Sequence, residues 1–125
     1  MSTTAKTILI IDDDARNIFA LSAVLKARGF ICLSALTARE GLEMLEENDA
    51  INIVLLDIMM PEMDGYEAVG IIRNNRKLFG MPVIAVTAQA MVGDKEKTLQ
   101  AGASAYISKP VDVDELLKLL HKFLN

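Results

Sequence analysis

Five short apolar runs, separated by segments of helical pattern, constrain the fold of this chain more than any other feature. The runs cover residues 7–11, 31–35, 52–57, 82–87 and 105–108. Strands this apolar have no face suited to water. A parallel sheet with helices on both of its sides is therefore expected.

The segments between the runs carry the signals of helices. In the first segment, Ile18, Leu21 and Leu25 recur at helical spacing before a glycine, which is a usual helix stop. The fourth, at about residues 91–101, is weak and offers little apolar surface beyond Leu99. The other helices are expected to begin at a Thr37/Glu40 capping box, after Asp64-Gly65 and at Asp112.

Strand and helix thus alternate five times along the chain. Right-handed crossovers then limit the ways in which parallel strands can be connected. We predict an α/β, flavodoxin-like (βα)5 fold, with a five-stranded parallel sheet in the order 2-1-3-4-5 and helices on both faces.

Length and charge narrow the classes of protein to which the chain can belong. A chain of 125 residues fits one domain, and residues 1–125 are expected to form a single unit. The net charge of −4 makes nucleic acid an unexpected direct partner. No stretch reaches the roughly 18 apolar residues of a membrane span, so a cytoplasmic location without membrane contact is expected. The single cysteine, Cys32, is interpreted as apolar filler.

Polar residues follow the strands at one edge of this predicted sheet. Because all strands of a parallel sheet point the same way, their carboxyl ends gather at the crevice beside the topological switch point. The residues expected there are Asp12, Asp13, Asp14, Asp57, Thr87, Ser108, Lys109 and Pro110. Acidic, hydroxyl and amine groups are therefore expected to share one pocket.

The chemistry of this pocket favours phosphoryl transfer to a carboxylate. Carboxylates that crowd together repel, and either raised pKa values or a bound cation relieve the repulsion. An all-oxygen site with open positions suits Mg²⁺, which also binds phosphoryl oxygens. Lys109 and the Thr87 hydroxyl can hold the other oxygens. Asp57 is the candidate nucleophile because carboxylates form acyl phosphates, whereas Asp14 is interpreted as the N-cap of the first helix.

Each of these residues alone has an ordinary structural explanation. An Asp after a strand is often a helix cap, a Thr commonly ends a strand, and a Lys before Pro usually lies in a solvated loop. The functional interpretation depends on the combination, because the polar residues at the ends of four strands all suit phosphoryl transfer.

The motifs ILIIDDD, LLDIMMPEMDG, VIAVTA and AYISKP, in this order and spacing, resemble those of the CheY-like response-regulator receiver domains of two-component signalling. The resemblance covers about residues 5–124. It implies that Asp57 is the phosphoacceptor and takes its phosphoryl group from a phosphohistidine on a histidine kinase or a phosphotransfer protein. It also implies that Mg²⁺ is bound by Asp12, Asp13, Asp57 and the main-chain carbonyl of Met59.

The same resemblance assigns residues to a switch. Lys109 would pair with the phosphoryl group and precede a cis bond to Pro110, and the Thr87 hydroxyl would move toward the phosphoryl group. Tyr106 would turn inward behind it, although a Tyr on a short strand is otherwise most often plain packing. The implied output face is helix 4, strand 5 and helix 5, which would control a downstream protein target or a linked output domain and is a possible homodimer surface.

The resemblance also implies that two positions tune the lifetime of the phosphoryl group. Met59 follows the acceptor by two residues, and Gln89 follows Thr87 by two. An apolar Met59 offers no hydrogen bond to an attacking water, so slow to moderate dephosphorylation is predicted unless Gln89 compensates. The protein is expected to be a regulator that catalyses only its own phosphorylation and dephosphorylation.

Two other classes of protein share part of this pattern of residues. A haloacid-dehalogenase-like phosphatase also uses a strand-end Asp, Mg²⁺, Thr and Lys, but it needs a longer chain and a second Asp where this chain has Met59. A docking module without phosphorylation is disfavoured by the intact set of polar residues. The motifs DDDARNIFAL and DIMMPEMDGYEA also resemble those of receiver domains attached to hybrid histidine kinases. The sequence leaves open whether the chain is a stand-alone regulator or part of a larger protein.

Overall fold

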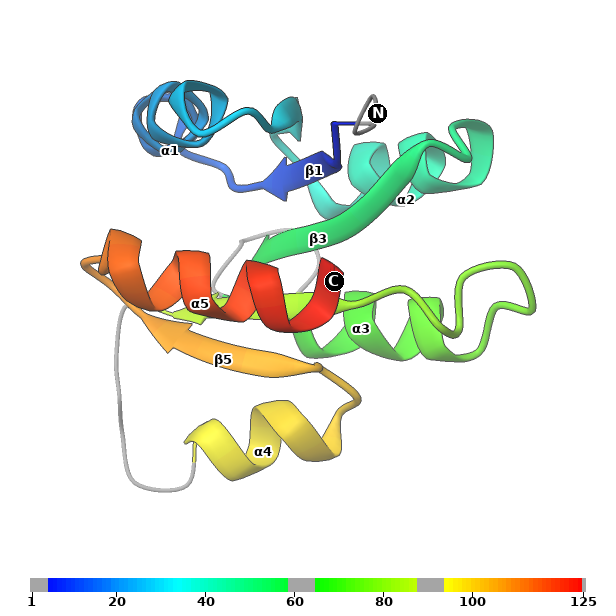
Figure 1. Ribbon diagram of the computed structural model, residues 1–125. Helices are drawn as coiled ribbons and strands as arrows, with labels where there is room; N and C mark the ends of the chain where they lie inside the picture. Colours follow the sequence, from blue (N-terminus) through cyan, green and yellow to red (C-terminus); the bar gives the residue numbers. More distant parts are fainter. Residues whose placement is uncertain (1–4, 59–64, 88–93, 125) are drawn as a thin grey trace.

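The computed structural model describes residues 5–58, 65–87 and 94–124, which form one alternating series of strands and helices (Figure 1). The strands are β1 (Thr7–Ile11), β2 (Ile31–Ala35), β3 (Ile51–Asp57), β4 (Val83–Thr87) and β5 (Ala105–Ser108). The helices are α1 (Ala15–Ala27), α2 (Ala38–Glu47), α3 (Gly65–Arg73), α4 (Asp94–Gln100) and α5 (Val113–Leu124). None of these described helices is long and apolar enough to cross a lipid bilayer.

The strands form one parallel sheet in the order β2-β1-β3-β4-β5. This confirms the predicted fold and strand order. Every residue of β1 and of β4 is buried, as expected for strands covered on both faces. The order reverses between β1 and β3, so the carboxyl ends of these two strands lie at the switch point of the sheet.

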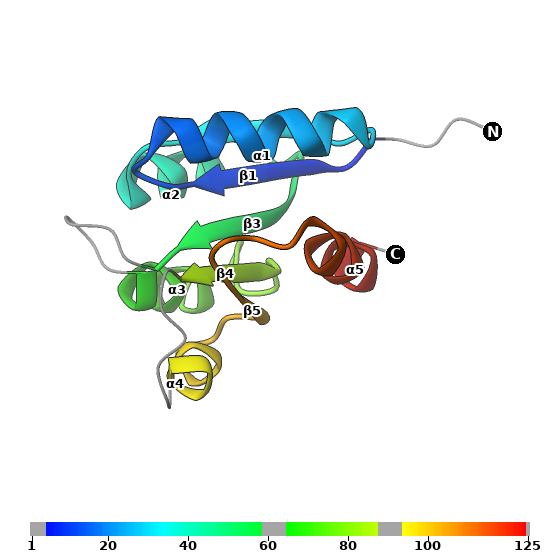
Figure 2. The ribbon, with the colours of Figure 1, turned by 90° about the vertical axis from the view of Figure 1, so that its left-hand side faces the viewer.

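Helices cover both faces of the sheet. On one face, Ile8 and Ile10 belong to a core cluster with residues of α1 and α5. On the other face, Leu9 and Ile11 pack with residues of α2 and α3. Figure 2 shows α5 on the opposite side of the strands from α2 and α3. Cys32 packs partly buried on the α1/α5 face, consistent with its interpretation as filler, and burial raises the pKa of its thiol.

The helix starts agree with the capping signals in the sequence. The Asp14 carboxylate accepts a hydrogen bond from the main-chain N–H of Arg16 at 2.9 Å, which confirms Asp14 as the N-cap of α1. The Thr37 hydroxyl oxygen accepts one from the N–H of Glu40 at 3.1 Å. Asp112 caps α5 in the same way. Each cap satisfies an N–H group that has no partner inside its helix.

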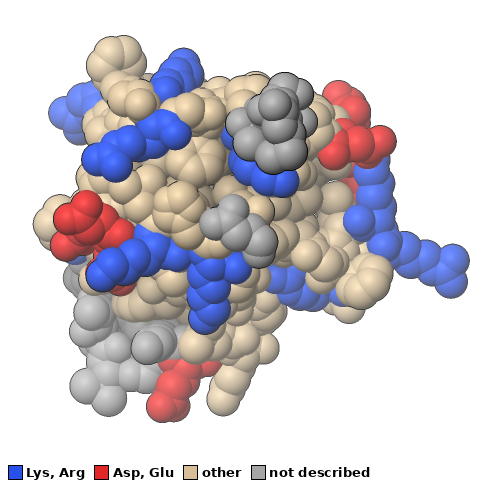
Figure 3. Space-filling model, viewed as in Figure 1, with Lys and Arg blue, Asp and Glu red and all other residues tan. Residues whose placement is uncertain are grey.

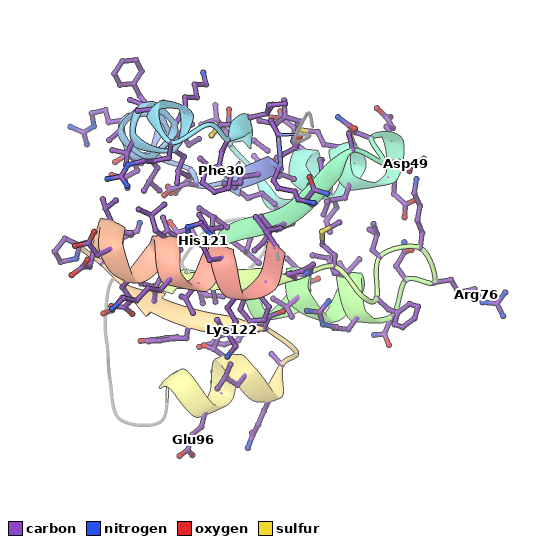
Figure 4. The ribbon with its side chains drawn as sticks, in the orientation of Figure 1. Phe30, Asp49, Arg76, Glu96, His121 and Lys122 are labelled. Atoms are coloured by element: carbon purple, nitrogen blue, oxygen red, sulfur yellow. The ribbon has the colours of Figure 1, made fainter. Side chains whose placement is uncertain are left out.

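The short helix α4 does not pack through the residue that the sequence suggested. Leu99 is 39% exposed, whereas Thr98 is 1% exposed. The Thr98 hydroxyl donates to the Tyr66 hydroxyl at 3.5 Å, and the ammonium of Lys97 lies 4.6 Å from the centre of the Tyr66 ring. Glu96 lies on the outer surface of α4 (Figure 4). Hydropathy alone selected the exposed side of this helix. The buried side packs through a polar residue, Thr98, against the aromatic Tyr66.

The outer surface of α5 is charged. Its first turn carries Asp114 and Glu115, and its last turn carries His121 and Lys122, a distribution that complements the helix dipole. Figure 3 shows acidic side chains near the start of α5 and basic side chains along it. His121, labelled in Figure 4, is exposed.

Candidate functional site

Two buried carboxylates meet where β1 and β3 end. The strands are neighbours, with Ile11 opposite Leu56, so the residues that follow in each strand lie side by side. Asp12 and Asp57 are each 4% exposed. One carboxylate oxygen from each of Asp12, Asp13 and Asp57 lies within 4.8 Å of the other two. The structure therefore brings the three acidic residues together, as the sequence predicted.

Lys109 joins this cluster from the end of β5. Its Nζ lies 3.2 Å from Oδ2 of Asp57 and 3.6 Å from Oδ2 of Asp12. Burial disfavours the ammonium, but the charges of the two carboxylates outweigh that effect and raise the pKa of Lys109. The main-chain N–H of Lys109 donates to the carbonyl of Thr87 at 2.7 Å, and the bond to Pro110 is cis, as the resemblance implied. A charged ammonium therefore stands beside the predicted acceptor.

Strand β4 brings the hydroxyl of Thr87 to the same edge. Asp57 lies opposite Val86 on β4, and Thr87 lies opposite Ser108 on β5. Thr87 is 4% exposed. Tyr106 precedes Ser108 by two residues, so its side chain is on the same face of the sheet as that of Thr87, and it is half-buried. The roles of Thr87 and Tyr106 in switching stay predictions.

Asn17, which the sequence analysis did not select, contacts the site. Its Nδ2 donates to Oδ2 of Asp12 at 3.5 Å, while the main-chain N–H of Asp14 donates to Oδ1 of Asp12 at 2.8 Å. Both oxygens of Asp12 are therefore oriented by the start of α1. The available signal was position, because a residue in the first turn of a helix that begins beside the site can turn back toward it.

Ile58, directly after Asp57, is in close contact with Gly65 at the start of α3. The N–H of Ile58 donates to the carbonyl of Val86 at 2.9 Å, and the N–H of Gly65 donates to the carbonyl of Ile58 at 2.9 Å. A Cβ on Gly65 would lie 2.5 Å from Cα of Ile58, so only glycine fits this approach. Met59, the predicted carbonyl ligand, and Gln89 lie outside the described residues, and their roles stay predictions.

The donor set of the described site fits a hard divalent cation. Asp12, Asp13 and Asp57 supply carboxylate oxygens, which are ligands that Mg²⁺ prefers. Among the described residues at this site, three carboxylates face the single ammonium of Lys109. A cation would relieve the remaining repulsion. The acidic cluster is therefore a candidate Mg²⁺ site.

Comparison with known proteins places the chain in a family. The profile of the response regulator receiver domain matches residues 8–121. The polar-differentiation response regulator DivK of Brucella ovis is 33% identical over 120 residues, which are 96% of this chain and 97% of DivK. The chain belongs to the response regulator receiver domain family. It is a phosphoacceptor signalling switch of the two-component type.

Solved structures agree with this assignment. The CheY-like response regulator receiver domain protein of Methanospirillum hungatei is 37% identical, with a TM-score of 0.84 over 95% of this chain and 93% of that one. The receiver domain of Ssk1 from Saccharomyces cerevisiae, crystallised with the histidine phosphotransfer protein Ypd1, is 24% identical. Its TM-score is 0.87 over 98% of this chain and 91% of that one, and this likeness supports the fold alone.

Proposed function

We propose that Asp57 accepts a phosphoryl group from a phosphohistidine on a histidine kinase or a phosphotransfer protein, with Mg²⁺ bound at the acidic cluster. The observation that carries this proposal is the ammonium of Lys109, 3.2 Å from Oδ2 of Asp57, beside the carboxylates of Asp12 and Asp13. A phosphohistidine donor is supported by the family to which the chain belongs, the receiver domains of response regulators. In this proposal, residues 1–125 form one receiver unit.

The transfer moves the phosphoryl group from nitrogen to oxygen. An Oδ atom of Asp57 forms a bond to phosphorus while the P–N bond of the phosphohistidine breaks, and its electron pair returns to the imidazole. The ammonium of Lys109 and the hydroxyl of Thr87 stabilise negative charge on the phosphoryl oxygens. Asp12 and Asp13, with Asp57, hold Mg²⁺, which supplies further charge neutralisation when bound.

Hydrolysis of the acyl phosphate resets Asp57. Water attacks phosphorus, the bond from phosphorus to the Asp57 oxygen breaks, and phosphate leaves. The chain thus catalyses only its own phosphorylation and dephosphorylation. Met59 and Gln89, whose structure is outside the described residues, set the rate at which water attacks, and the apolar Met59 favours a slow to moderate rate.

Phosphorylation changes the surface through charge. It adds about −1.5 to −2 units of charge and three strong acceptors at Asp57. One acceptor draws the Thr87 hydroxyl toward it, which opens space for the half-buried Tyr106. The phosphoryl group shifts an equilibrium between two existing states of α4, β5 and α5.

The surface formed by α4, β5 and α5 binds the output partner in this proposal. That partner is a downstream protein, a linked output domain or a second copy of the chain. Leu99 on α4 is 39% exposed, and Lys118 and Lys122 on α5 are exposed. Leu117 and Leu124, in contrast, pack half-buried against the core, so α5 contributes mainly charged surface.

A mass measurement tests the proposed acceptor. The protein is incubated with Mg²⁺ and acetyl phosphate, and the expected result is a stable gain of one phosphoryl group that is absent in Asp57→Asn. Steady turnover of phosphate esters would instead indicate a phosphatase. No modification, with Mg²⁺ binding intact, would contradict phosphorylation and leave a docking role.

A further inference from the structure

A cavity of about 510 Å³ opens beside the acidic cluster, between α1 and the segment that joins β5 to α5. Its polar end is formed by Asp12, Asn17, Asp57 and Lys109. The rest of its wall is mainly aliphatic and includes Leu21, Val24, Leu55, Val86, Val111 and Val113. The cavity therefore has one charged end and one apolar body.

Phosphoryl transfer accounts only for the polar end of this cavity. A phosphoryl group and its cation contact charged and polar atoms, and neither gains from aliphatic side chains such as Val24 and Val111. Small-molecule sites are typically clefts of roughly 300–1,000 Å³, mostly apolar, with a few convergent polar groups. The volume and the lining of this cavity match that description, so it has room for a molecule larger than a phosphoryl group.

The charged end determines which head group the cavity favours. Among the described residues there, Asp12 and Asp57 line the cavity, Asp13 lies beside them, and Lys109 is the single cation. The excess charge is negative. Asp12 and Asp57 are each 4% exposed, so solvent screens their charges weakly. An ammonium is favoured here and a carboxylate is repelled.

We propose that this cavity binds a small amphipathic amine. Its primary ammonium lies at Asp12 and Asp57, and its apolar body, of about ten carbon atoms by the size of the site, lies against Val24, Leu55 and Val111. The ammonium and Mg²⁺ use the same carboxylates and exclude each other. The amine therefore holds the protein in its metal-free state and slows phosphorylation. Its binding requires neither Mg²⁺ nor a phosphoryl donor, so this inference can fail while the proposed function stands.

An NMR titration of the full chain with 4-phenylbutylamine, without Mg²⁺, tests the proposal. The expected shifts centre on residues 10–24 and 109–113. 4-Phenyl-1-butanol has the same body and no charge, and it should bind about tenfold more weakly because a charge-assisted hydrogen bond is lost. Methylammonium lacks the body and should bind roughly fiftyfold more weakly, as expected for losing roughly 100 Å² of apolar burial. Added Mg²⁺ should raise the apparent Kd of the amine.

Two variants of α1 provide a matched pair. Ala20 lines the cavity, and Ala20→Leu should weaken 4-phenylbutylamine binding about tenfold while Mg²⁺ binding is retained. Ala23, exposed on the same helix, is outside the lining, and Ala23→Leu should bind the amine like the wild type. Equal affinity for the amine and the alcohol, or an Ala20→Leu protein that binds as tightly as Ala23→Leu, would overturn the proposal.

Discussion

Lys109 is the residue whose charge holds the metal-free site together. Its ammonium lies within 4 Å of two carboxylates that are almost completely buried. Burial lowers the pKa of Lys109, and the charges of Asp57 and Asp12 raise it by more. Without a metal, this pairing offsets part of the repulsion between the acidic residues, and its contribution to stability follows the protonation of Lys109.

We predict a pH-dependent stability difference between the wild type and Lys109→Met, both without Mg²⁺. A group whose pKa is raised by folding stabilises the protein below its unfolded pKa, here 10.5, and that stability is lost as pH rises through the folded value. The wild type should be the more stable by a constant amount from neutral pH to about pH 10, and the difference should then close. Urea unfolding of both proteins at each pH measures it. A difference that persists unchanged at about pH 12 contradicts the assignment.

Asn17 is predicted to position Asp12 for the metal. Asn17→Ala removes the 3.5 Å contact to Oδ2 and should weaken Mg²⁺ binding about three- to tenfold, less than the roughly 10–100-fold typical of such residues, because the bond is long. An NMR titration with Mg²⁺ measures the affinity, and urea unfolding checks that the fold is retained. Ala23→Leu on the exposed side of α1 serves as the control. Unchanged Mg²⁺ affinity in Asn17→Ala would show that the contact has no positioning role.

The charged members of the site were predictable from the sequence, whereas the residues that orient them were not. A residue that follows a strand of a parallel sheet lies at the carboxyl edge, so Asp12, Asp57 and Lys109 were expected to share that edge. Asn17 depends on the rotation of α1 about its axis, which the apolar spacing fixes only to within one residue. The polar contact of Thr98 likewise carries no hydropathy signal.

At the scale of elements, Arg73 ties the end of α3 to the segments on both sides of β4. Its guanidinium donates to the carbonyls of Gly102 at 2.7 Å, Met81 at 2.8 Å and Phe79 at 3.1 Å, and to the hydroxyl of Ser104 at 3.3 Å. Burial lowers the pKa of Arg73. The planar fork of donors suits several acceptors at once. The C-terminal end of α4 is therefore anchored to α3.

Arg73→Met is expected to destabilise the protein by about 2–3 kcal/mol, because several partly buried acceptors lose their donor. Arg73→Lys should recover only part of this loss, since an ammonium cannot span the same acceptors. Arg76→Met changes an exposed arginine three residues further on, labelled in Figure 4, and should be nearly neutral. Urea unfolding gives the stabilities. A cost for Arg73→Met no larger than that for Arg76→Met would contradict the anchor.

The strands and most helices were predicted closely, because the signals that define them lie in the local sequence. Strand runs 7–11, 31–35 and 105–108 were expected with the bounds that the structure has. An apolar run that is bounded by capping residues fixes both the limits of an element and whether it is a strand or a helix. The weak prediction was α4, a helix of seven residues with few apolar side chains, whose place is set by Tyr66 and Arg73 across the fold.

At the scale of the whole molecule, the fold concentrates repulsion at one edge of the sheet. The acidic cluster is at the carboxyl ends of the strands. Asp49 and Arg76 lie at the opposite end (Figure 4), where Asp49 pairs with Lys77 at 2.8 Å. Relief of the repulsion at the carboxyl edge by a cation therefore stabilises the entire domain, because β1 and β3 both run through its centre.

Mg²⁺ is accordingly predicted to raise the melting temperature by mass action. At ten times its Kd, a ligand of the native state adds about 1.4 kcal/mol, which is about 5 °C for a domain of this size. Asp13 is exposed, so Asp13→Ala should fold normally, melt slightly higher without Mg²⁺ because one like charge is gone, and lose most of the Mg²⁺ effect. Na⁺ at matched ionic strength separates specific binding from screening. An equal Mg²⁺ response in the wild type and Asp13→Ala would show that the cation binds elsewhere.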